Sequence, residues 1–141
     1  MRRFVTLLCA CFLLLSVATA LGQSAEAGIP KILVTGFDSY KSAGLDEAVR
    51  VWLRGSPLEG TQEAASQESV LHATQAAYGP YRGFDLASVR QVSPSTRIVY
   101  LTIDYEKGPL FAKFVMFHAE PGWIVTSLLF NTNDTAVLPL Q

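Results

Sequence analysis

The sequence has few residues that carry chemistry, and what it lacks excludes several classes of function. Its 141 residues include only two cysteines and two histidines. Both cysteines, Cys9 and Cys11, lie inside an N-terminal apolar run. We therefore expect neither a disulfide nor thiol chemistry in the mature protein, whose fold must rely on a hydrophobic core. The absence of G-x-S-x-G and of a complete G-x-G-x-x-G leaves no signature of a serine hydrolase or a dinucleotide-binding domain.

An excess of positive charge is missing as well. The chain has 11 basic and 12 acidic residues. Removing Arg2 and Arg3 with an N-terminal leader leaves 9 basic residues against 12 acidic ones, a net charge of −3. Nucleic acids and anionic membrane surfaces attract proteins that carry a basic patch. We therefore expect no nucleic-acid partner.

The N-terminal segment has the organisation of a signal peptide. Two arginines follow the initiating Met, residues 4–18 form an uncharged apolar run of fifteen residues, and Ala18-Thr19-Ala20 is a small-x-small cleavage pattern. Fifteen is short of the roughly 20 apolar residues that cross a bilayer. We predict a cleaved Sec-type signal peptide over residues 1–20, with cleavage after Ala27 as the alternative, and a periplasmic or secreted product.

Two helices are predicted by apolar periodicity in the first half of the mature chain. In residues 45–54, apolar side chains recur at i, i+3, i+4, i+7 and i+8, with acidic residues in the first turn and basic ones in the last. Trp52 belongs to this stripe, which predicts a core anchor, with ligand stacking as the alternative. A longer helix is predicted for residues 61–78, with Thr61 as its N-cap and a buried stripe that includes Ala77.

Residues 29–40 are ambiguous between helix and strand. Their apolar side chains follow helical spacing, and Pro30 suits the first turn of a helix. Residues 31–36, however, also look like the opening strand of a nucleotide-binding domain. We favour the helix, because no further glycine completes the nucleotide-binding motif.

From about residue 84 onward the apolar period changes from 3.6 to 2, which predicts strands. Four antiparallel strands are expected, within residues 84–92, 97–107, 110–118 and 123–130. A type II turn is expected with Pro121 and Gly122 at its centre. The last two strands are apolar on both faces, whereas a sheet with one solvated face alternates cleanly. Either helices cover one face and a partner subunit the other, or the sheet curls around a cavity.

No set of residues defines a catalytic site, and the candidate ligand-binding residues are Tyr78, Tyr100, Asp104 and Lys113. An isomerase would need a carboxylate base and a hydrogen-bond donor in an apolar pocket. Asp104 and Tyr100 are of these types, but they lie about 13 Å apart along one strand. Asp85 with Tyr78 or Tyr81 is a second pair of these types. We expect no catalytic residue.

Lys113 is a charge within an apolar strand, for which two interpretations stay open. It marks an edge strand protected from aggregation, which we favour, or it points into a polar part of a cavity. The two histidines, His72 and His118, have no paired ligand at i+2 or i+4. We therefore predict no metal site and no cofactor.

The order of the predicted elements resembles that of a known superfamily. Helices followed by a four-stranded antiparallel meander, over residues 29–139, look like the cystatin-like α+β folds and in particular the NTF2-like superfamily. The resemblance lies in the element order and in the strand sequences of residues 97–107 and 110–130, and it implies one domain in which N-terminal helices pack on a curved sheet. It also implies homodimers through the open sheet face, a common arrangement in that superfamily.

The function expected from these observations is an exported, non-catalytic binding or assembly module of the bacterial envelope. Its expected partners are a second copy of the chain through the sheet face, a small apolar ligand or an envelope protein. The alternative is a small isomerase- or dehydratase-like enzyme with a pocket inside the cone of the sheet. The resemblance in fold does not distinguish a binding module from an enzyme, because the superfamily includes enzymes, ligand binders and dimerisation modules.

Overall fold

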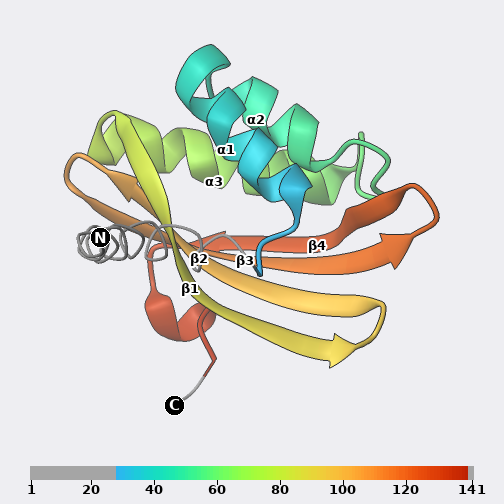
Figure 1. Cartoon of the computed structure of the whole chain (residues 1–141). Coiled ribbons are helices and arrows are strands. Elements are labelled where there is room, and N and C mark those ends of the chain that lie inside the picture. Colours follow the sequence, from blue (N-terminus) through green and yellow to red (C-terminus); the bar gives the residue numbers. More distant parts are fainter. Residues whose placement is uncertain (1–27, 140–141) are drawn as a thin grey trace, which may run out of the picture.

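The computed structural model describes residues 28–139, in which three helices precede a four-stranded antiparallel sheet (Figure 1). The predicted signal peptide therefore lies outside the described residues. Among those that are described, no helix is long and apolar enough to span a membrane. The elements in chain order are α1 (Lys31–Ala43), α2 (Leu45–Trp52), α3 (Gln62–Tyr78), β1 (Tyr81–Ser93), β2 (Thr96–Tyr105), β3 (Gly108–Ala119), β4 (Gly122–Asn131) and the 3-10 turn η1 (Asp134–Ala136).

The ambiguous first segment is a helix, as favoured. Pro30 is the N-cap residue of α1: its carbonyl oxygen accepts from the N–H of Leu33 at 2.9 Å, and its missing N–H costs nothing there. Leu33, Phe37 and Tyr40 form its buried stripe at i, i+4 and i+7. Gly44 ends the helix at φ 95°, a conformation that favours glycine, and α2 begins at the next residue.

The predicted N-cap of α3 is confirmed. The side-chain oxygen of Thr61 accepts a hydrogen bond of 3.2 Å from the backbone N–H of Ala64. The predicted buried stripe of this helix is wrong at Ala77, which is exposed, whereas Leu71 and Thr74 are buried. The stripe therefore runs along the N-terminal and central turns of α3, where the helix packs against β4.

The sheet is a meander of order β1-β2-β3-β4, joined by tight hairpins. The pairing of the strands corrects two predictions, one about the last hairpin and one about Lys113. Ala119 pairs with Gly122, so the loop residues of the last hairpin are Glu120 and Pro121, one residue earlier than predicted. Lys113 lies on β3, which pairs with β2 and β4, so the edge-strand interpretation of this lysine is wrong. In a meander only the first and last strands are edges.

The core lies between the helices and one face of the sheet, which we call the inner face (Figure 1). Trp52 is at its centre and is fully buried, which confirms it as a core anchor. Its ring packs edge-on against Phe37 and Phe114 at centroid distances of 4.9 and 5.4 Å. Its indole N–H donates to the carbonyl oxygen of Leu33 at 3.2 Å.

The free edge of β4 is covered by side chains from the helical layer. The backbone N–H of Phe130 donates to the side-chain oxygen of Gln67 on α3 at 2.8 Å. The hydroxyl of buried Ser56, in the connection between α2 and α3, donates to the carbonyl oxygen of Val125 at 2.5 Å. These bonds use backbone groups that would otherwise be open to pairing with another strand.

Candidate functional site

The sheet face that points away from the helices, here called the outer face, carries three of the four predicted site residues. Along β2, Val99, Leu101 and Ile103 point inward and are fully buried, so the alternating residues point outward. Tyr100 and Asp104 are therefore on the outer face. Lys113 is directly opposite Tyr100 in the pairing of β2 with β3, and it shares that face.

The fourth predicted residue, Tyr78, does not join this group. It is the last residue of α3, and its ring lies against Gly108 at the turn between β2 and β3. Its carbonyl oxygen accepts a hydrogen bond of 2.9 Å from the N–H of Lys107. Tyr78 therefore anchors the end of a helix to a hairpin.

Asp104 has a partner that sequence reasoning did not assign to it. The pKa of its carboxyl is raised by partial burial, by the negative charge of Asp85 and by a hydrogen bond with Asp85. Asp85 lies on β1, which pairs with β2 through two register shifts near this point. Alternation puts both residues on one face, and Asp85 pairs with Thr102, so it lies diagonally across from Asp104. The result is an acidic pair at one end of the outer face.

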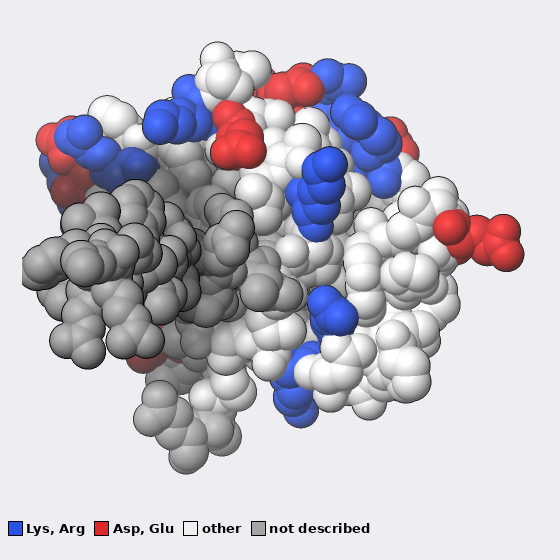
Figure 2. Space-filling view, viewed as in Figure 1, with Lys and Arg blue, Asp and Glu red and all other residues white. Residues whose placement is uncertain are grey.

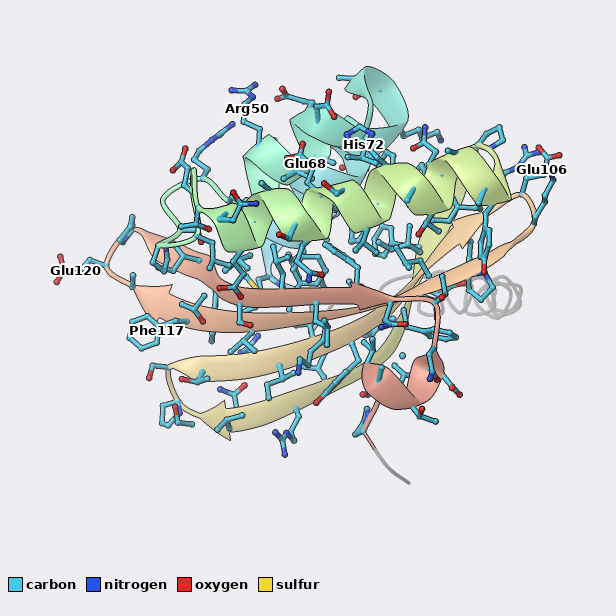
Figure 3. All side chains as sticks on the ribbon, turned by 180° about the vertical axis from the view of Figure 1, so that it is seen from behind. Arg50, Glu68, His72, Glu106, Phe117 and Glu120 are labelled. Atoms are coloured by element: carbon cyan, nitrogen blue, oxygen red, sulfur yellow. The ribbon has the colours of Figure 1, made fainter. Side chains whose placement is uncertain are left out.

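The opposite end of the outer face is apolar. Phe117 on β3 follows the fully buried Met116, and it is 42% exposed. It pairs with Ile124 on β4, and the neighbouring outward residues Ile98 and Val115 are half-buried. In Figure 3, Phe117 projects from the sheet on the side away from α3. Figure 2, from the opposite side, shows mostly uncharged surface toward the hairpin ends of the sheet, with basic side chains beside it and an acidic side chain projecting at the outer edge.

The C-terminal segment occupies part of the outer face. Figures 1 and 3 both show η1 on the side of the sheet away from the helices. Val137, which follows η1, is 4% exposed, and Tyr100 on the outer face is 6% exposed. Neither belongs to the core on the inner face. The open part of the outer face is therefore the end around Phe117, with Lys113 between it and the acidic pair.

The inner side contains a polar cluster of tyrosines rather than an acid-base site. The hydroxyl of Tyr40 donates to Gln75 at 2.8 Å and is 2.9 Å from the hydroxyl of Tyr105. Tyr81 stacks on Tyr40 with ring centroids 4.2 Å apart. Burial raises the pKa of all three phenols above the ordinary value. They stay neutral at physiological pH; Tyr40 and Tyr105 satisfy each other's hydroxyls in the core, and Tyr81 packs against them.

A shallow groove lies between the helices and the last hairpin. Its volume is about 450 Å³, and its lining comes from α1, the end of α2 and the β3–β4 turn. Trp123 supplies an aromatic wall, and Lys31 and Arg54 supply two positive charges. The ring of Trp123 is itself held between the guanidinium of Arg97, 4.6 Å from its centroid, and the edge-on ring of His118. Such a groove suits a small anionic group.

Three described side chains on the helices could hold a cation. Asp46 on α2 and Glu68 and His72 on α3 have ligand atoms within 4.8 Å of one another. The prediction that His72 has no paired ligand considered only positions i+2 and i+4 and missed Glu68 at i−4. The spacing of Glu68 and His72 was the available signal, because residues at i and i+4 share one helix face. Asp46 could be found only from the packing of α2 beside α3.

A comparison with solved structures identifies the class of fold. A similar structure is that of a domain of unknown function with a cystatin-like fold from Nostoc punctiforme PCC 73102, determined at 2.00 Å resolution. The two chains share 15% sequence identity and a TM-score of 0.51, over 79% of this chain and 78% of that one. No family model and no curated protein matches the sequence.

The chain therefore has a cystatin-like α+β fold, three helices followed by a curved four-stranded antiparallel sheet. This confirms the fold class that the element order and strand sequences predicted. At 15% identity the likeness concerns the fold alone, and the function must be argued from the chain's own surface.

Proposed function

We propose that this chain is an exported, non-catalytic binding or assembly module of the bacterial envelope, and that its outer sheet face binds a second copy of the same chain. The observation that carries the proposal is the contrast between the two faces of the sheet. The inner face is closed by Trp52, Phe37 and Phe114, each at most 1% exposed. The outer face leaves Phe117 42% exposed beside half-buried apolar neighbours.

The filled interior is the argument for a binding role over the isomerase-like alternative. An enzyme of that kind needs a pocket that contains an acid or base able to change its protonation state. The space between the helices and the sheet is packed with aromatic side chains, and its buried polar side chains are neutral phenols and the hydroxyls of Ser56 and Thr74. Asp104 and Tyr100, the pair that an isomerase-like site would use, are on the outer face instead.

The outer face is also complementary to itself, which favours a second copy as its partner. Lys113 forms no ion pair with another described residue, and Asp104 lies about 13 Å along the neighbouring strand. In a two-fold interface, residue i of one copy meets residue j of the other and the reverse. A two-fold axis beside Phe117 joins the apolar surfaces of the two copies, with each Lys113 at the margin of that contact.

Export is proposed from the N-terminal sequence. A positively charged start, an apolar run and small-x-small cleavage patterns are the parts of a signal peptide, and both cysteines of the chain lie within that segment. The proposal expects a periplasmic or secreted product whose mass corresponds to a chain that starts at Leu21, or at Gly28 for the alternative cleavage. Fractionation of cells followed by intact-mass measurement checks this part.

The binding face can be tested in the cell with a photo-crosslinking amino acid at position 117. The proposal predicts a crosslinked product with twice the mass of the chain. The same amino acid in place of Ala65, an exposed residue on α3, is the control and should produce no such product. A product with another envelope protein would show a different partner, and equal crosslinking from both positions would contradict a specific face.

A further inference from the structure

Two helices bring a mixed set of metal-ligand side chains together on the side of the molecule away from the sheet. Glu68 and His72 are one turn apart on α3, and in Figure 3 both lie on the side of that helix that faces α2. Asp46 is in the first turn of α2. His72 Nε2 and Asp46 Oδ1 are 2.9 Å apart. The cluster therefore joins two helices that are separate in the sequence.

The distances within the cluster fit one ion. Ligand atoms bound to a tetrahedral Zn²⁺ at about 2.1 Å lie about 3.4 Å from one another. All three ligand atoms here are within 4.8 Å of one another. Two of the side chains are largely exposed, 56% for His72 and 79% for Asp46. Rotamer changes of these exposed side chains can therefore shorten the distances between the ligand atoms to about 3.4 Å without disturbing the core.

The nearby Arg50 does not form an ion pair with the carboxylates of the cluster. Arg50, one turn after Asp46 on α2, is the basic residue of that helix's last turn. Its guanidinium is paired with Glu47 through hydrogen bonds of 2.8 and 2.5 Å. Asp46 and Glu68 thus remain as two carboxylates with an imidazole and no Arg–carboxylate pair between them.

We propose that Asp46, Glu68 and His72 form a binding site for a divalent transition metal of the zinc type. An imidazole nitrogen with two carboxylate oxygens is a donor set that suits such ions, whereas Mg²⁺ and Ca²⁺ prefer oxygen ligands alone. Three protein ligands leave the outward coordination position to water. The bound ion links α2 to α3 directly.

The two histidines of the sequence allow a residue-specific test by NMR. The full-length untagged chain, with Cys9 and Cys11 replaced by Ser because thiolates also bind zinc, is titrated with ZnCl₂. The proposal predicts that the imidazole resonances of His72 shift or broaden at stoichiometric zinc, while those of His118 stay in place. Isothermal titration calorimetry of the same sample should show one site.

Matched variants separate the proposed site from general surface binding. His72→Ala and Glu68→Gln should each weaken zinc binding at least about tenfold, and His118→Ala should leave it unchanged. MgCl₂ should produce no comparable shift of the His72 resonances. Equal shifts of both histidines, or full binding retained in the His72→Ala and Glu68→Gln variants, would overturn the proposal, and so would the absence of any zinc response in the parent protein.

Discussion

Gly36 and Trp52 are packed so closely that no side chain fits between them. A Cβ atom built on Gly36 would lie 2.0 Å from Nε1 of Trp52, well inside the closest contact that real side chains make. Trp52 is fully buried and its indole N–H is hydrogen-bonded to Leu33, one turn before Gly36 on α1. The glycine therefore sets how near α1 can approach the centre of the core.

The first prediction concerns this contact. Gly36→Ala should destabilise the protein by about 3 kcal/mol, because overpacking a filled core forces the helix or the indole to move. Gly83→Ala is the matched control, since a Cβ at Gly83 meets no atom within 4 Å, and it should change the free energy of unfolding by less than about 0.5 kcal/mol. Urea denaturation of both variants measures the difference, and similar values for the two would contradict the packing described.

The buried tyrosine cluster supports a second prediction. Tyr40→Phe should cost about 2 kcal/mol, because it leaves both Gln75 and the hydroxyl of Tyr105 without their partner. Tyr105→Phe should cost about 1 kcal/mol, because Tyr40 can still donate to Gln75. Thermal or urea unfolding measures both. Tyr78→Phe is the control and should be nearly neutral, and the reverse order of the first two would show that the hydrogen bonds are arranged differently.

The acidic pair on the outer face makes stability depend on pH. The pKa of Asp104 is raised by desolvation and by Asp85, so the folded protein holds this proton more tightly than the unfolded chain does. The group's contribution to stability is therefore full below the unfolded pKa and falls as pH rises through the raised value.

Asp85→Asn should thus stabilise the monomer at pH 7 by about 0.5 kcal/mol, as expected for relief of a cross-strand like-charge pair. At about pH 3, where both carboxyls of the wild type are protonated, the gain should vanish. Unfolding curves across this pH range give the comparison, with Glu120→Gln, an exposed acid at a hairpin tip, as the control. A gain that is the same at both pH values would rule out the proposed charge repulsion.

The elements were predictable from the sequence because each one has a local signal. The stripe of α2, the Thr61 N-cap and the period-2 strands depend on neighbours within a few residues. Helix and strand could not be separated for residues 31–36 by periodicity alone, and tertiary packing against Trp52 decides for the helix. Lys113 looked like an edge residue, whereas its place on an inner strand follows from the order of the strands.

The candidate sites were less predictable because they depend on tertiary structure. Alternation along β2 and β3 is sufficient to put Tyr100, Asp104 and Lys113 on one face. The contact of Asp104 with Asp85 depends on the register in which β1 pairs with β2, which no residue pattern predicts. The contact of His72 with Asp46 depends on how α2 lies beside α3, so the sequence contained only the Glu68–His72 half of that cluster.

The association state of the protein tests the proposed binding face most directly. Sedimentation of the wild type across a concentration series should show a monomer–dimer equilibrium. Phe117→Asp should weaken the dimer at least about 30-fold, as loss of a central apolar anchor of about 2 kcal/mol implies, and Ala65→Asp, with the same added charge on α3, should not. A wild type that stays monomeric at all concentrations, or a Phe117→Asp variant that associates as the wild type does, would contradict the account.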